Sequence, residues 1–148
     1  MNASWTIPFI ILGGALQSCG AAMNGQLNKS LINPWLASAV SFVPIVFFFI
    51  GAFLVMPTPL PTTKDLAAMP WWAVLGGLVG AVQVYAGLTL VNKVGAGPFV
   101  GFTVTASLLA SLAIDHFGWL RMDVHPLNIW RALGGLLLIG GVTLIAKF

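Results

Sequence analysis

The sequence predicts an all-α integral membrane protein with five transmembrane helices, because it is strongly apolar and contains five long apolar runs. Of its 148 residues, 59% are hydrophobic and 6% are charged, and the mean hydropathy is +1.00. The runs cover residues 5–27, 35–56, 71–91, 98–120 and 127–146. Each has about the 20 residues that an α-helix needs to cross a bilayer. Residues 1–148 are therefore predicted to form a single five-helix transmembrane domain.

Tryptophan supports this segmentation, because all the tryptophans lie at the ends of the runs. The ring prefers the headgroup layer of a bilayer. The residues are Trp5, Trp35, Trp71, Trp72, Trp119 and Trp130. The net charge of +3 is spread over the connections between the runs, so this composition excludes a soluble domain and a nucleic-acid-binding protein.

Proline and glycine separate the predicted helices. A tight turn leads to Pro34, which suits the start of the second helix, and Pro44 is expected to bend that helix. The segment 57–61, Pro-Thr-Pro-Leu-Pro, cannot be helical, although residues 63–66 can form one interfacial turn. Gly-Ala-Gly-Pro at 95–98 breaks the chain between the third and fourth helices.

The first run is expected to be an uncleaved helix. Leu16-Gln17-Ser18-Cys19 loosely resembles a lipoprotein cleavage box, but no Lys or Arg precedes it and the apolar run continues past the cysteine. Cys19 is the single cysteine, so no intramolecular disulfide can form.

The Lys and Arg residues are divided equally between the two sides of the membrane. With the N-terminus on side A, that side carries Lys64, Arg121 and Arg131, and side B carries Lys29, Lys93 and Lys147. Short loops take their orientation from an excess of these residues on the cytoplasmic side, so this chain has no preferred orientation. Two opposed copies can form an inverted repeat of the kind found in secondary transporters. We therefore predict an antiparallel homodimer with ten helices.

Two of the predicted helices place amide side chains on a face otherwise made of small residues. On the first helix this face comprises Gly13, Gln17, Ala21, Asn24 and Asn28, and on the third it comprises Gly76, Gly80, Gln83 and Gly87. Amides without partners are costly in hydrocarbon, so Gln17, Asn24 and Gln83 are expected to point into the bundle. They can line a substrate cavity, or they can form hydrogen bonds that only hold the helices together. The glycines on both faces favour the cavity.

Hydroxyl side chains on the fourth helix are weaker candidates for the same cavity. Thr103, Ser107 and Ser111 are spaced by four residues, but such hydroxyls often bond to their own helix. Thr103 and Ser107 are kept as predicted substrate-binding residues. Tyr85 lies on the far side of the third helix from Gln83, so it is expected to be packed.

The charged residues near the last connection are expected to stabilise the fold and not to bind a metal or catalyse a reaction. Asp115 and Arg131 lie on the same side of the membrane and are predicted to form a structural ion pair between the fourth and fifth helices. Asp115-His116 and Asp123-x-His125 contain possible metal ligands, but their spacing matches no tight motif. We predict no metal site and no cofactor. No catalytic arrangement lies inside the spans, so an enzyme is not expected.

Several stretches of the chain form a recognisable set. They are Ala15-Leu16-Gln17, Asn24-Gly25-Gln26-Leu27, Asn33-Pro34, residues 70–77 (Pro-Trp-Trp-Ala-Val-Leu-Gly-Gly) and residues 110–118 (Ala-Ser-Leu-Ala-Ile-Asp-His-Phe-Gly). Together they resemble the YdcZ-like five-helix family of the drug/metabolite transporter superfamily. The resemblance implies inverted five-helix halves with alternating access, located in the bacterial inner membrane.

The last helix adds a second resemblance. Gly134-x-x-Leu137-Leu138-x-x-Gly141 is similar to the dimerisation pattern of the last helix in small multidrug-resistance proteins. Those four residues are therefore predicted to form the dimer interface, where glycines permit close approach. Exporters of that kind use a glutamate in their first helix to exchange protons for cationic drugs, whereas this chain has Gln17 and Asn24 there.

The predicted function is that of a secondary transporter for a small neutral, zwitterionic or anionic metabolite. Its expected partners are that small-molecule substrate, membrane lipid and a second copy of the chain, or a homologous chain in place of that copy. The alternative is a non-transporting membrane subunit that partners or regulates a larger membrane complex. In that case the amides would bond only to neighbouring helices.

Overall fold

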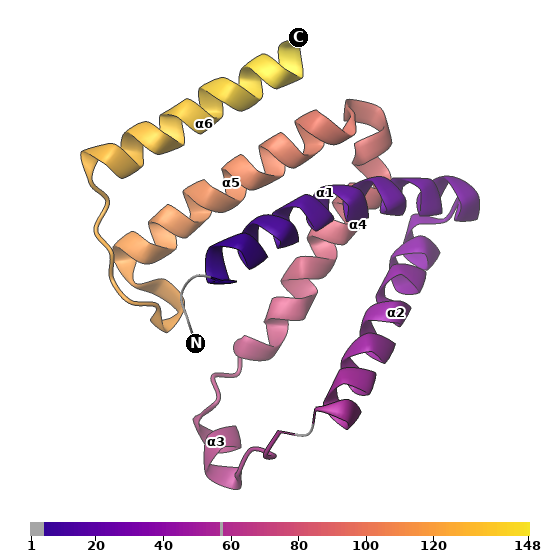
Figure 1. Cartoon of the computed structure of the whole chain (residues 1–148), viewed down its shortest axis with the longest axis vertical. Helices are drawn as coiled ribbons and strands as arrows, with labels where there is room; N and C mark the ends of the chain where they lie inside the picture. The colour runs from indigo at the N-terminus through magenta and orange to yellow at the C-terminus, as the bar shows by residue number, and fades with distance from the viewer. Residues whose placement is uncertain (1–4, 57) are drawn as a thin grey trace. The chain divides into compact units, whose positions relative to one another are not determined.

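A computed structural model describes residues 5–56 and 58–148, in which every regular element is helical (Figure 1). The helices are α1 (Thr6–Leu31), α2 (Pro34–Val55), α3 (Thr63–Ala68), α4 (Gly76–Val94), α5 (Ala96–Phe117) and α6 (Ile129–Lys147), with 3₁₀ turns η2 (Ala73–Leu75) and η3 (Trp119–Arg121). Five of the described segments are long and apolar enough to cross a membrane, with η2 and α4 forming one continuous span. The prediction of an all-α chain with five membrane-spanning helices is confirmed.

Local capping explains where several helices begin. Pro34 is the first residue of α2, as predicted, and the Asn33 side chain accepts hydrogen bonds from the backbone N–H groups of Trp35 and Leu36 at 3.0 and 3.2 Å. The helix continues through Pro44 to Val55. The Asn128 side chain caps α6 in the same way by accepting from Arg131 N at 2.9 Å.

A capping box forms the short helix α3 in the connection between α2 and α4. The Thr62 hydroxyl and backbone N–H both donate to Asp65, at 2.7 and 2.8 Å. Hydrogen bonds from the Thr62 side chain and then from its backbone hold the pKa of Asp65 below its ordinary value. A lowered pKa means that this cap is present at neutral pH and is lost as the pH falls through that pKa. Pro57, at the start of this connection, lies outside the described residues.

Three helix C-termini differ most from the sequence prediction, and one of them is that of α4, which continues to Val94 instead of ending at Val91. Helix α1 continues to Leu31 instead of ending at Leu27, because the chain turns only at Ile32, which has a φ of 63° and donates its backbone N–H to Asn28 O. Helix α5 ends at Phe117 instead of Leu120, because Gly118 adopts a left-handed conformation with φ of 63° and its N–H bonds to Ile114 O.

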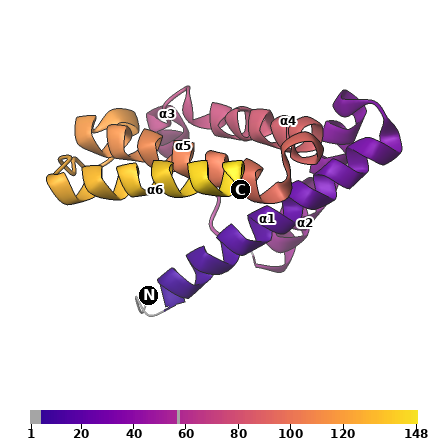
Figure 2. The ribbon, with the colours of Figure 1, turned by 90° about the horizontal axis from the view of Figure 1, so that it is seen from above.

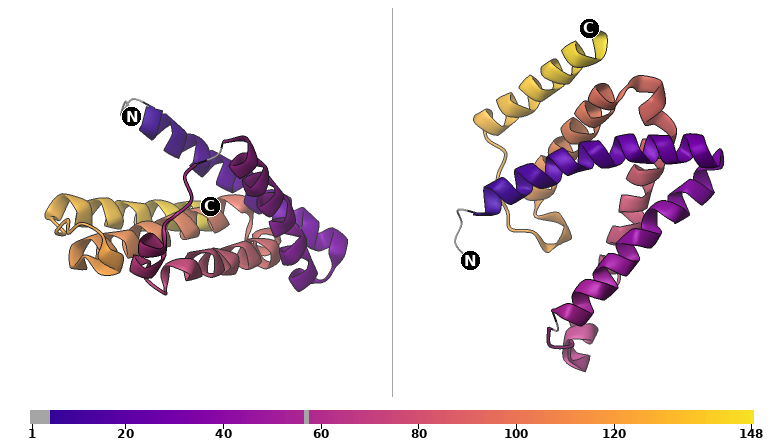
Figure 3. Two further views of the ribbon diagram at one scale, coloured as in Figure 1. Left: turned by 90° about the horizontal axis from the view of Figure 1, so that it is seen from below. Right: turned by 45° about the vertical axis from the view of Figure 1, so that its right-hand side comes forward.

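The described chain divides into two compact units, with the boundary between Lys93 and Val94. The first unit contains α1 to α4, and α1 and α2 are joined by a tight turn (Figure 3). The second contains α5 and α6, which lie side by side in both Figure 1 and Figure 2. Whether these two units pack into the single predicted domain of residues 1–148 depends on their contact with each other, so the single domain stays a prediction.

The buried core of each unit is small. Ala37, Leu88 and Val91 are buried in the first unit, and Val142 is buried in the second. Most large apolar side chains of the spanning helices are exposed, as expected where hydrocarbon is the solvent and apolar surface need not be hidden.

Gly118→Ala should destabilise the second unit. A Cβ at this position would meet Val124 Cγ2 at 2.7 Å, and a left-handed conformation costs a non-glycine residue about 1 kcal/mol or more. We expect a lower midpoint of thermal unfolding in detergent, measured by circular dichroism. Gly14→Ala is the control, because a Cβ there has no neighbour within 4 Å. An equal effect of both changes would show that the conformation of Gly118 is not the cause.

Candidate functional site

Helices α1 and α4 are joined by two reciprocal amide hydrogen bonds. Asn28 Nδ2 donates to Leu88 O at 3.0 Å, and Asn92 Nδ2 donates to Gly25 O at 2.7 Å. A Cβ on Gly25 would overlap Val91 Cγ1, so glycine is needed for this close approach. Leu88 and Val91 are 0% and 4% exposed. This contact is the buried centre of the first unit.

The three amides predicted to bind substrate are placed differently. Asn24 Oδ1 accepts a hydrogen bond from Ser41 Oγ at 2.9 Å, which links α1 to α2. Gln17 on α1 and Gln83 on α4 are both exposed. Within the described residues, Asn24 is the only one of the three that makes a side-chain hydrogen bond. Gln17 and Gln83 therefore remain available to bind a group from outside the chain.

The predicted helix faces around these amides are open. Cβ atoms built on Gly13, Gly76 and Gly80 would have no neighbour within 4 Å, although Gly87 is buried. Tyr85 stacks on Trp35 with ring centroids 4.7 Å apart, which agrees with the expectation that it is packed. The open part of the two faces thus lies toward the N-terminal ends of α1 and α4.

Asn92 is a residue that the sequence reasoning did not select. It lies one position beyond the predicted end of the third run, where a polar residue is ordinarily assigned to a loop. Asn28 was placed on the polar face but was not assigned a role. The signal that could have found both is Gly25, whose lack of a side chain permits the backbone of α1 to be reached.

Two hydroxyl side chains of α5 bond to their own helix. Thr103 Oγ1 donates to Phe99 O and Ser111 Oγ donates to Ser107 O, both at 2.8 Å. Ser107 itself is exposed. The buried hydroxyl residue of this unit is Thr105, which is 7% exposed and was not singled out from the sequence. Back-bonding of this kind satisfies a hydroxyl without a ligand.

Asp115 and Arg131 are brought together at the polar end of the second unit. Asp115 Oδ2 lies 3.7 Å from Arg131 Nη1, and both side chains are about a third exposed. Arg131 Nη1 also donates to His125 O at 3.0 Å, and the His125 backbone N–H donates to Asp115 O at 2.8 Å. The pair therefore belongs to a network that holds the connection between α5 and α6.

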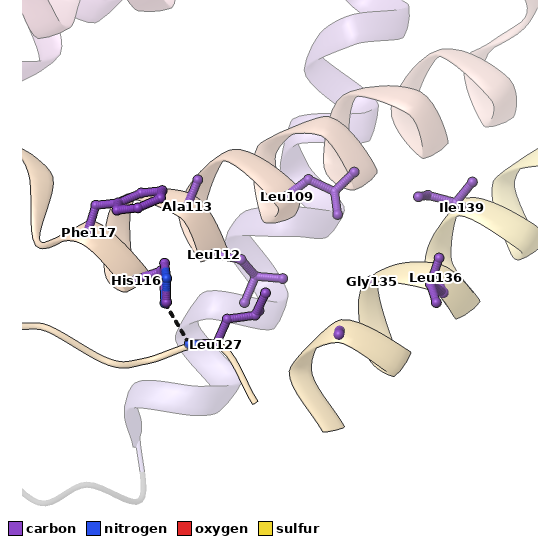
Figure 4. A pocket seen from close by; sticks show the side chains of 10 residues that line it. Leu109, Leu112, Ala113, His116, Phe117, Leu127, Gly135, Leu136 and Ile139 are labelled. Atoms are coloured by element: carbon purple, nitrogen blue, oxygen red, sulfur yellow. Dashed lines mark hydrogen bonds between the residues drawn. The ribbon is translucent and has the colours of Figure 1, made fainter. Parts of the chain in front are cut away.

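His116 makes a further hydrogen bond between the end of α5 and the connection to α6. Its Nδ1 accepts from the Leu127 backbone N–H at 3.0 Å, as Figure 4 shows. Among residues 5–56 and 58–148 there is no cluster of three or more His, Cys, Asp or Glu side chains that could hold a metal ion. This end of the hairpin is thus bonded mainly through the backbone of its connection.

Two apolar grooves follow the α5–α6 hairpin. One, of about 580 Å³, is lined by side chains such as Leu109, Leu112 and Ile139, with His116 at its polar end (Figure 4). The other, of about 300 Å³, is lined in part by Thr105, Leu138 and Gly141. Their walls offer few hydrogen-bonding groups, so they suit apolar contacts.

Of the residues predicted to form the dimer interface, Leu137, Leu138 and Gly141 border the groove of about 300 Å³ beside α5, and Gly134 does not. Helix α6 packs on α5 through Gly135, whose Cβ would meet Leu109 at 3.1 Å, and through Val142. Gly134 and Gly141 have no neighbour within 4 Å of a built Cβ. Leu137 and Leu138 are 68% and 38% exposed. These residues are therefore not buried in the chain, and their role in a dimer interface stays a prediction.

Five apolar spans with neutral amides and hydroxyls inside them define a multi-pass membrane protein. The family described as "Putative inner membrane exporter, YdcZ" matches residues 5–144, so the chain belongs to the YdcZ family. It is 27% identical to inner membrane protein YdcZ of Escherichia coli (strain K12), over 99% of this chain and 98% of that protein. No solved structure matches the chain. The predicted family and the predicted location, as a multi-pass inner membrane protein, are confirmed.

Removing either partner of the Asp115–Arg131 pair should lower stability modestly. The charges are partly solvated and 3.7 Å apart, so Asp115→Asn or Arg131→Gln should cost about 1 kcal/mol or less. Exchanging the two charges should recover part of that loss. Chemical unfolding in detergent measures the free energy of unfolding of each variant. Asp123→Asn, in the same connection, is the control. Unchanged stability with lost transport in Asp115→Asn would instead identify a functional carboxylate.

Proposed function

We propose that this chain is a secondary transporter of the drug/metabolite type that moves a small neutral, zwitterionic or anionic metabolite by alternating access in an antiparallel homodimer. The observation that carries the proposal is the exposure of Gln17 and Gln83 on membrane-spanning helices. An amide left in hydrocarbon without a partner costs several kcal/mol, about 4 to 8 on the cyclohexane scale. A polar ligand held between helices removes that cost.

The chemistry of the spans supports an uncharged or negatively charged ligand. The chain has three acidic residues, Asp65, Asp115 and Asp123, and each lies in a connection or at a helix end. A cationic ligand would ordinarily need a membrane-embedded carboxylate. Amides instead supply paired donors and acceptors, which orient a ligand without a net charge.

Two features support the second copy in opposite orientation. The five spans place equal numbers of Lys and Arg residues on the two sides of the membrane, namely Lys64, Arg121 and Arg131 on one side and Lys29, Lys93 and Lys147 on the other. The positive-inside rule therefore favours neither orientation. On α6, none of the residues Gly134, Leu137, Leu138 and Gly141 is buried, and the last three border an apolar groove. Glycines there permit the close helix contact on which membrane association depends.

Gln17→Leu and Gln83→Leu should each abolish transport while leaving the protein folded, since both side chains are exposed in the single chain. The measurement is uptake into proteoliposomes of three radiolabelled probes: a neutral polyol, a zwitterionic amino acid and a monocarboxylate. Gln26→Leu, at another exposed position of α1, is the matched control and should transport normally. Affinity for a transported probe should vary little between pH 5 and pH 8, because amides do not titrate there.

Two results would contradict this assignment. Uptake that survives both substitutions would move the site toward Thr103 and Ser107. No uptake of any probe by the unaltered protein, together with co-purification of another membrane protein, would favour the alternative of a non-transporting subunit.

The orientation of the two copies has its own test. In a Cys19→Ser background, Phe148→Cys should be labelled by an impermeant thiol reagent from both sides of the membrane, in similar amounts. Ser30→Lys adds a positive charge on side B and should shift the ratio strongly toward one orientation. If every copy of the unaltered chain showed its C-terminus on one side, a separate homologous partner would have to replace the second copy.

A further inference from the structure

We infer that Gly25, Asn28 and Asn92 form a pivot between α1 and α4, and that this pivot positions the segments that carry Gln17 and Gln83 around the transported ligand. The inference rests on the proposed function, because alternating access requires some part of the first unit to stay fixed while the segments that carry Gln17 and Gln83 move. We assign that fixed part to the pivot. We call this contact the α1–α4 pivot.

The bonding at the pivot is reciprocal and uses backbone acceptors. Asn28 of α1 donates to Leu88 O of α4 at 3.0 Å, and Asn92 of α4 donates to Gly25 O of α1 at 2.7 Å. A backbone carbonyl keeps its position when side chains change rotamer. The two helices therefore remain joined at this point while their amide side chains adjust to a new crossing angle.

The contact is confined to the C-terminal ends of the two helices. Toward their N-termini, Cβ atoms built on the glycines of α1 and α4 have no neighbour within 4 Å. These glycines are Gly13, Gly14, Gly20, Gly76, Gly77 and Gly80. Gln17 precedes Gly25 by about two helical turns, and Gln83 precedes Leu88 by between one and two turns. Both ligand-binding amides are therefore on the free segments of the helices and outside the pivot.

The order of the spans determines the side of the membrane at which the pivot holds α1 and α4 together. Helices α1 and α4 belong to the first and third spans, so they cross the membrane in the same direction and their C-terminal ends lie on the same side. Lys29 and Lys93, which follow Asn28 and Asn92 directly, mark that side. The pivot thus closes the α1–α4 pair at this side and leaves its N-terminal segments free to separate.

The side-chain oxygen of Asn28 accepts no hydrogen bond from the described residues. This atom, Oδ1, is buried. Buried polar atoms are ordinarily satisfied where a contact serves only to hold helices together. The unused Asn28 Oδ1 can accept a hydrogen bond at a second crossing angle of the two helices, while the two amide donors keep their bonds and the contact stays joined.

The first test measures the free segments without any ligand. Spin labels at Leu12→Cys and Val79→Cys, in a Cys19→Ser background and diluted with unlabelled copies, report the distance between α1 and α4 within one chain. Asn28→Ala with Asn92→Ala should broaden the distance distribution, since each bond shifts such an equilibrium by about three-fold. Gln26→Ala is the control. An unchanged distribution would overturn the pivot, whatever the uptake assay shows.

The second test uses a steric change with a rescue. Gly25→Ala places a methyl group against Val91 Cγ1 and 2.9 Å from Asn92 Nδ2. The Val91 side chain cannot easily turn away, because a β-branched side chain in a helix has one strongly preferred rotamer. Gly25→Ala should reduce the maximal uptake rate of the transported probe with little change in its KM. Adding Val91→Ala removes the closest contact and should restore part of that rate. Gly20→Ala is the matched control, because its Cβ would have open space. Failure of Val91→Ala to restore the rate would contradict the pivot.

The two tests separate this inference from the proposed function. A broadened distance distribution in the double asparagine variant, in a protein that transports none of the three probes, would leave the pivot standing and refute transport of those probes. Normal uptake by Gly25→Ala, with the distances unaltered, would keep the transporter and remove the pivot.

Discussion

The cost of leaving a polar group unpaired in hydrocarbon is the constraint on which the rest of this structure depends. It requires the spanning segments to be helices, because only then are their backbone groups paired within the segment. It also explains why Thr103 and Ser111 bond to carbonyls one turn earlier in α5. The same cost applies to a partly buried amide at a helix contact, and Asn28 and Asn92 each satisfy a donor by reaching the backbone of the neighbouring helix.

Glycine determines where helices meet within each unit. At Gly25 and Gly135 an added Cβ would meet a side chain of another helix, so these positions bring α1 to α4 and α6 to α5. Gly134 and Gly141 have open space instead. The glycines of α6 therefore differ in their surroundings: Gly135 packs against α5, whereas Gly134 and Gly141 have room for a side chain.

Much of the fold follows from local features of the sequence. Apolar length predicts the spans, Pro34 predicts the start of α2, and the tryptophans mark the ends of the spans. The helix ends at Leu31 and Phe117 were displaced because an apolar run measures the hydrocarbon, whereas a helix ends where its backbone is capped. The capping by Gly118 depends on a left-handed conformation that hydropathy does not report.

The sequence by itself determined that this is a five-span membrane protein of the YdcZ family, because hydrocarbon demands long apolar helices and the family motifs are contiguous in the chain. It also placed Gln17, Asn24 and Gln83 on polar faces, since the helical period is a local property. The tertiary structure decided that Asn24 bonds to Ser41, and that Asn28 and Asn92 join α1 to α4. Such pairings depend on which helices approach within hydrogen-bonding distance, and no spacing within one helix encodes that.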